Sequence, residues 1–156
     1  MLYGSLAFEV SALEVFNRPS PGGTAVVDIC PSWRGTLISA PSAARLFDLT
    51  SDTAADGVGA TPRLGDTNLD NIGYATTQAW SRFFHASPGV HGLRYFSCRA
   101  ADRGGIATVA FRKAAIGAAG PQHLLIDDAL WPYLVHTLDS VGIGVNRVAD
   151  CPKCAR

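Results

Sequence analysis

Glutamate is rare in this sequence, and its two copies, Glu9 and Glu14, fall in one stretch with a helical pattern. At about 100° per residue they are separated by about 140° around the helix axis, so they do not form a paired-carboxylate site. Glu14 lies about 40° from Val10, at the border of an apolar stripe formed with Leu6 and Leu13. A carboxylate at such a border costs free energy unless it is paired or lies in a cleft. Two interpretations remain, a catalytic or sugar-binding carboxylate and a helix-edge residue that reaches solvent.

Ser97 lies in a basic stretch of the sequence. Residues 82–113 hold six basic groups and only Asp102 as an acid, whereas residues 1–80 hold four basic groups and eight acids. Most of the basic residues are arginines, whose forked guanidinium groups grip phosphate. A serine at a strand end beside such groups can hold phosphate or ribose, although no GxSxG motif marks it as a nucleophile. The stretch is therefore either an anion site or a solvated basic face.

The histidines and cysteines do not complete a metal site. Four histidines lack the HxxxH and HExxH spacings: His85, His91, His123 and His136. Cys151 and Cys154 form one CxxC, which is half of a zinc site, and it lies close to the last residue. We expect an ordinary tail over 151–156, with a small metal or redox protein as the alternative.

The composition limits the class of protein. The chain has 156 residues, 47% of them hydrophobic and 17% charged, which suffices for one domain with a buried core. It lacks an apolar run of about 20 residues and a signal peptide, so we expect a cytoplasmic protein that contacts no membrane. Thirteen basic and thirteen acidic residues give zero net charge, which argues against direct binding of nucleic acid.

Hydropathy and turn residues predict a mixture of strands and helices, hence one α+β or α/β domain over 1–150. A long Gly- and Asp-rich loop is expected over 51–72. The second main helix should carry Ala75, Ala79 and Phe83 on one stripe, and Asp127 or Asp128 is a candidate cap of the third. The predicted strands are 2–4, 25–29, 45–50, 93–97, 106–111, 124–126 and 143–148, and the predicted helices are 6–16, 74–85 and 127–140.

Several segments together resemble the RES domain family, which is named for an Arg, a Glu and a Ser. Leu2-Tyr3-Gly4 and the helix ending Ala12-Leu13-Glu14-Val15-Phe16 resemble the start of the domain. The segment Tyr74-Ala-Thr-Thr-Gln-Ala-Trp80 resembles its "Y..TQ.WA" helix, and Gly92-Leu-Arg-Tyr-Phe-Ser97 resembles its "GI.Y.S" strand. The resemblance covers about residues 2–112.

The resemblance implies a fold like that of ADP-ribosyltransferases, a mixed β-sheet with flanking helices. It also implies a toxin of an Xre–RES type toxin–antitoxin pair, partnered by a helix-turn-helix antitoxin. Such toxins consume NAD⁺ as a substrate, as glycohydrolases or phosphorylases that cleave the nicotinamide–ribose bond, and some transfer ADP-ribose to a protein. By position Glu14 and Ser97 become the catalytic candidates, and five residues become candidates for lining the pocket: Tyr3, Tyr74, Thr77, Tyr95 and Arg99.

One motif residue of the family has no counterpart. The family's Arg lies upstream of the segment that matches Leu2-Tyr3, so we expect an N-terminally shortened domain. Three explanations stay open: a truncated gene, a misplaced start, or a shortened domain in which another Arg substitutes, with Arg99 as the candidate. Three hypotheses follow: an NAD⁺-consuming enzyme, an inactive or truncated RES-fold protein that acts as a binding module, and the metal or redox protein of the CxxC.

Overall fold

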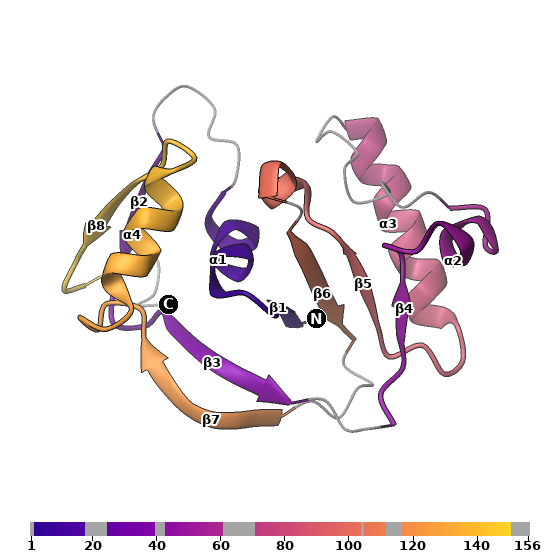
Figure 1. The fold of residues 1–156 in the computed structure, drawn as a ribbon, viewed down its shortest axis with the longest axis horizontal. Helices are drawn as coiled ribbons and strands as arrows, with labels where there is room; N and C mark the ends of the chain where they lie inside the picture. The colour runs from indigo at the N-terminus through magenta and orange to yellow at the C-terminus, as the bar shows by residue number, and fades with distance from the viewer. Residues whose placement is uncertain are drawn as a thin grey trace. The chain divides into compact units, whose positions relative to one another are not determined.

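The computed structural model describes residues 2–17, 25–39, 43–60, 71–103, 105–111 and 117–150. It contains both helices and mixed β-sheets, which confirms the predicted α+β class (Figure 1). The chain divides into two compact units, each built from two separate segments. Unit 1 comprises 1–14 and 40–116, and unit 2 comprises 15–39 and 117–156.

Unit 1 is built on a four-stranded sheet with strand order β1-β6-β5-β4. β1 pairs antiparallel with β6, β6 pairs antiparallel with β5, and β4 pairs parallel with β5. The central strands β5 and β6 are rich in the branched and aromatic residues that favour strands. The bounds are β1 (Leu2–Ser5), β4 (Leu46–Asp48), β5 (Gly92–Phe96) and β6 (Ile106–Ala110).

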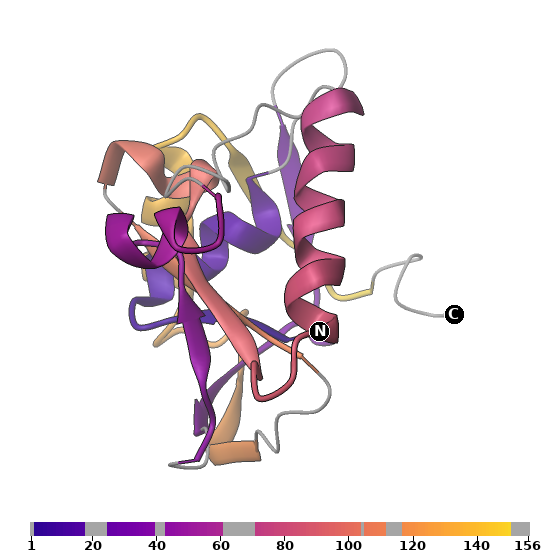
Figure 2. The ribbon, with the colours of Figure 1, turned by 90° about the vertical axis from the view of Figure 1, so that its right-hand side faces the viewer.

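Helix α3 (Asn71–Ala86) lies alongside this sheet (Figure 2). Apolar residues of one of its faces pack against the core cluster of unit 1. Trp80 and Phe84 are one turn apart, and the Phe84 side chain is buried against the sheet residues Phe47 and Leu93. Ala75, Ala79 and Phe83, which the sequence places on one stripe, are exposed, so another face of this helix packs against the sheet. The remaining members of the core cluster are Leu49, Ala55, Ala60, Val109 and Phe111.

Helix α1 (Phe8–Phe16) follows β1 and carries residues of both units. The Ser5 hydroxyl accepts a hydrogen bond from the Ala7 backbone N–H, and the helix then begins at Phe8 rather than at the predicted Leu6. Leu6 is fully exposed, outside the helix. Val10, Ala12, Leu13 and Phe16 are buried, as expected for a helix that is apolar nearly all round.

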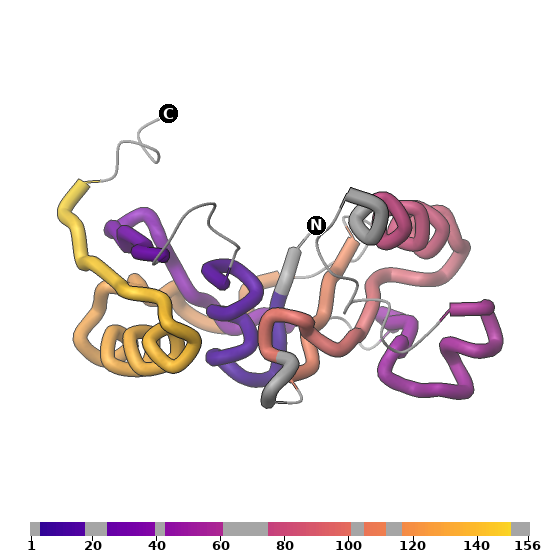
Figure 3. The backbone as a smooth tube through the Cα atoms, turned by 90° about the horizontal axis from the view of Figure 1, so that it is seen from above, coloured from indigo at the N-terminus to yellow at the C-terminus, as the bar shows by residue number. Residues whose placement is uncertain are grey.

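Unit 2 contains two strand pairs and helix α4 (Trp131–Asp139). β2 (Val26–Ile29) and β8 (Gly144–Arg147) are parallel, and Figure 3 follows the chain from α4 into β8. β3 (Arg34–Ser39) and β7 (Gly117–Leu124) are antiparallel, with an irregularity between Thr36 and Ile38. The buried residues of this unit include Phe16, Ile29, Leu134, Leu138 and Ile143.

Three further sequence-based expectations about elements differ from the structure. The predicted loop contains helix α2 (Asp52–Asp56), which the side chain of Ser51 caps by accepting a hydrogen bond from Ala54 N–H. Strand β7 ends at Leu124, where a strand was predicted to start. Asp127 does not cap α4 but accepts hydrogen bonds within the preceding turn, and α4 begins at Trp131. The predicted tail over 151–156 lies outside the described residues, and a single domain over 1–150 stays a prediction.

Within the part of the chain that the structure describes, no helix is long and apolar enough to cross a membrane.

Candidate active site

The carboxylate of Glu14 is held against the central strand of the unit 1 sheet. The Tyr95 hydroxyl, on β5, donates a hydrogen bond of 3.2 Å to Glu14 Oε2. Glu14 Oε1 is buried and has no hydrogen-bond partner among the described residues. A buried acceptor without a partner costs about 1–3 kcal/mol, and such an atom is a functional-site candidate. Glu14 as a whole is half-buried, so the choice between the two interpretations stays a prediction.

Ser97 lies directly after β5, on the face of the strand that carries Tyr95, because alternate strand residues point the same way. Its side chain is only 1% exposed. The Ser97 hydroxyl oxygen accepts a hydrogen bond from Ala100 N–H at 3.2 Å, and Ser97 N–H donates to Gly105 O at 2.8 Å. Among the described residues no acceptor is seen for the hydroxyl hydrogen, which can therefore bond a ligand.

Gly105 allows helix α1 to approach the turn that holds Ser97. A Cβ at position 105 would lie 2.7 Å from Ala100 Cβ and 3.0 Å from Val10 Cγ2. Val10 is one helical turn before Glu14 and so shares its side of α1. The structure thus brings the helix of Glu14, the strand end of Ser97 and the Tyr95 side chain into one region of unit 1.

A protein-family model matches the chain that carries this region. The model, described as RES domain, matches residues 1–135, which is most of the chain. The chain belongs to the RES domain family. No match is found among curated proteins or among solved structures. A likeness of its fold to ADP-ribosyltransferases therefore stays a prediction.

The other predicted pocket residues of this RES domain lie on three elements. Thr77 is half-buried on the α3 face that also carries Trp80 and Phe84, and Arg99 is half-buried in the 3-10 segment η2 (Cys98–Arg103) after Ser97. Tyr3 is paired in register with Val109 of β6, and Tyr74 is in the first half of α3. The side chains of Tyr3 and Tyr74 lie outside the described residues. The roles assigned to all seven site residues stay predictions.

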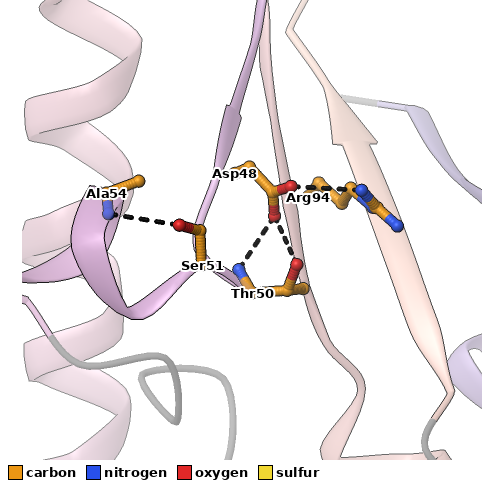
Figure 4. A network of polar contacts seen from close by, with 5 residues as sticks. All are labelled: Asp48, Thr50, Ser51, Ala54 and Arg94. Carbon is orange, nitrogen blue, oxygen red and sulfur yellow. Dashed lines mark hydrogen bonds and ion pairs between the residues drawn. The ribbon is translucent and has the colours of Figure 1, made fainter.

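The basic stretch of the RES domain is not one cluster of free guanidinium groups. Arg94 Nη1 forms an ion pair of 3.1 Å with Asp48 Oδ2 on the neighbouring strand β4 (Figure 4). Arg94 and Tyr95 are consecutive on β5, so they point to opposite faces of the sheet. The Arg94–Asp48 pair therefore lies on the face away from Glu14 and Ser97. Sequence reasoning missed this pair because the parallel register that places Asp48 beside Arg94 joins residues 46 positions apart.

The environment of Asp48 keeps its carboxylate ionised. Burial raises the pKa of Asp48, but hydrogen bonds from Thr50 N–H and Oγ1 and the positive charge of Arg94 outweigh it, so the pKa is below its usual value. The Thr50 bonds are 2.9 Å from N–H and 2.5 Å from Oγ1 (Figure 4). These contacts join the ends of β4 and β5 and give Asp48 a structural role.

No group of three or more possible metal ligands is found among the described residues. Cys151 and Cys154 lie outside them.

Proposed function

We propose that this RES domain protein consumes NAD⁺ by cleaving the bond between nicotinamide and ribose. The observation that supports the proposal is the Glu14 carboxylate, with Oε2 bound by Tyr95 and Oε1 buried without a partner. Membership of the RES domain family supports NAD⁺ as the substrate. The same membership supports a partner antitoxin with a helix-turn-helix domain, which co-purification with the product of a neighbouring gene would test.

The chemistry of the bond suits a half-buried carboxylate such as that of Glu14. As nicotinamide leaves, its ring nitrogen takes the bonding electron pair, and positive charge develops on the ribose ring as an oxocarbenium-like centre. A carboxylate in a partly dry site stabilises that charge, and Glu14 Oε1 would also accept a hydrogen bond from a ribose hydroxyl. Nicotinamide departs neutral, so no strong general acid is needed.

Ser97 would supply a second contact to the sugar. Its oxygen already accepts a hydrogen bond from Ala100 N–H, which fixes the hydroxyl near the end of β5. Its hydrogen is then free to point at a ribose or phosphate oxygen. Water as acceptor gives ADP-ribose and a proton, phosphate gives the phosphorylated sugar, and a protein nucleophile gives an ADP-ribosylated protein.

The test compares the two glutamates of the chain. Glu14→Gln should lower the rate of nicotinamide release from NAD⁺ at least a hundredfold, because the charge that stabilises the transition state is removed while the shape is kept. Glu9→Gln is the matched control, since Glu9 is exposed in the first turn of the same helix. Its rate should stay within twofold of the wild-type rate.

Assays with and without phosphate, followed by analysis of the sugar product, separate hydrolysis from phosphorolysis. A wild-type protein that releases no nicotinamide under either condition would overturn the proposed enzyme. A Glu14→Gln variant as active as Glu9→Gln would overturn the role of Glu14.

A further inference from the structure

The hydroxyl of Tyr95 is bound to one of the two oxygens of the Glu14 carboxylate. Its donation to Oε2 at 3.2 Å joins residues 81 positions apart in the chain. The other oxygen, Oε1, is buried and has no hydrogen-bond partner within the described ranges. One oxygen of the carboxylate therefore has a hydrogen-bond partner, and the other has none among the described residues.

We propose that Tyr95 is the positioning residue of Glu14: it fixes one carboxylate oxygen so that the other is presented to the ribose. This inference rests on the proposed function. In this proposal the Tyr95 hydroxyl contacts Glu14 and does not contact the substrate, which differs from its predicted role as a pocket-lining residue.

A glutamate on a helix needs such a partner to be ordered. Its last torsion is broad and roughly two-fold, so an unheld carboxylate samples many directions. Within the described residues, Tyr95 is the one group seen to hydrogen-bond this carboxylate. A hydrogen bond to a charged group is stronger than one between neutral groups, so the bond can select one orientation.

The ring of Tyr95 is itself fixed by its surroundings. Tyr95 is on the central strand β5, opposite Ala107 of β6, and it packs against the core cluster of unit 1. A donor carried by a central strand is a rigid reference point, which is what a positioning group requires. Phenylalanine at position 95 would keep the ring contacts and remove only the hydroxyl.

The first measurement is steady-state NAD⁺ turnover by Tyr95→Phe. We expect kcat to fall at least tenfold while KM stays within about twofold, because the bond acts on the orientation that the transition state needs rather than on substrate binding. Tyr133→Phe is the matched control, since Tyr133 is exposed on α4, and its kcat and KM should be those of the wild type. A Tyr95→Phe variant with wild-type kcat would overturn the inference.

The second measurement reports on the contact without any turnover. The chain has two glutamates, so protein labelled with ¹³C at the glutamate side-chain carboxyl gives two resonances. Tyr95→Phe should shift the Glu14 resonance and leave that of Glu9 in place, and Glu14→Gln and Glu9→Gln assign the two signals. A Glu14 resonance unchanged in Tyr95→Phe would show that the hydroxyl does not hold the carboxylate and would also overturn the inference.

The two measurements separate this inference from the proposed function. If wild-type protein releases no nicotinamide, the proposed function fails and the catalytic meaning of Tyr95 fails with it, whatever the resonance shows. If wild-type protein is active and Tyr95→Phe matches it, only the inference fails.

Discussion

Ser97 and Ser51 make the same kind of hydrogen bond but in different places. Each hydroxyl oxygen accepts a backbone N–H three residues later: Ala100 N–H at 3.2 Å for Ser97 and Ala54 N–H at 3.3 Å for Ser51. Ser97 lies beside Tyr95 at the end of β5, whereas Ser51 caps the short helix α2. Comparing variants of the two serines therefore distinguishes the contribution of this hydrogen bond to stability from a role of the Ser97 hydroxyl in catalysis.

We predict that Ser97→Ala lowers NAD⁺ turnover at least tenfold, and that both Ser97→Ala and Ser51→Ala lower the free energy of unfolding by about 1–2 kcal/mol. The stability loss comes from the backbone N–H that each change leaves without its acceptor. Urea unfolding and nicotinamide release measure the two effects. Equal activity of the two variants would show that the Ser97 hydroxyl has only a structural role.

The sequence singles out Glu14 and Ser97 as candidates, but it carries no sign of the contact that holds Glu14. The position of Glu14 beside a buried stripe marks it as unusual, and a resemblance to the RES domain selects Ser97 from many serines. The Tyr95–Glu14 hydrogen bond depends on how α1 and β5 pack, and 81 intervening residues carry no local signal for it. Long-range contacts of this kind are seen only in the folded structure.

At the scale of elements, the sequence predicts the helices and strands whose formation depends on local hydrophobic spacing. The apolar residues of α1, α3, β5 and β6 have helical or strand-like spacing, and these elements lie near their predicted positions. β7 has the sequence GAAGPQHL, in which Gly, Ala and Pro disfavour strands, and it forms by pairing with the distant β3. Helix α2 depends on a cap and on the burial of Ala55 in the core of unit 1, which a loop-like composition conceals.

The contacts of Asp48 with Arg94 and Thr50 at the ends of β4 and β5 should make the stability of the protein depend on pH. The pKa of Asp48 is lower in the folded protein than its ordinary value of 3.8, so the folded state binds fewer protons than the unfolded state near that pH. The stabilisation is therefore present above the unfolded pKa of about 3.9 and is lost as pH falls through the lower folded pKa. Its size is modest, because the Asp48 side chain is 38% exposed and solvent screens the Arg94 charge.

Asp48→Asn should accordingly be less stable than wild type at pH 7, and the difference should close as the pH is lowered below about 4. Thermal or urea unfolding measures this stability difference across pH 2.5–7, a range that extends about one unit or more on either side of the ordinary carboxyl pKa. Asp56→Asn, a change to an exposed carboxylate at the end of α2, is the control and should give a pH profile close to that of wild type. A difference between Asp48→Asn and wild type that persists unchanged at low pH would contradict the pKa argument.

At the scale of the whole molecule, the two compact units are interleaved in the chain. Residues 15–39 of unit 2 separate the two segments of unit 1, and residues 40–116 of unit 1 separate those of unit 2. Helix α1 carries Glu14 in unit 1 and Phe16 in unit 2, where the Phe16 ring packs edge-on against Trp33 with centroids 4.9 Å apart. A unit made of two separate segments cannot fold until both segments have come together. This arrangement favours cooperative folding of the whole chain.

Cooperativity can be tested by damaging one unit and observing the other. Leu134 is fully buried on α4 of unit 2, and Leu134→Ala should lower the free energy of unfolding by about 2–5 kcal/mol. If the chain unfolds as one domain, hydrogen exchange of the amides of β5 and β6 in unit 1 should accelerate to match that loss, because core strands exchange through global opening. Tyr133→Ala, at the neighbouring exposed position, is the control and should change exchange in β5 and β6 little. Exchange in β5 and β6 that stays at its wild-type rate in Leu134→Ala would mean that the units open independently. The site at Glu14, Tyr95 and Ser97 would then depend on unit 1 alone.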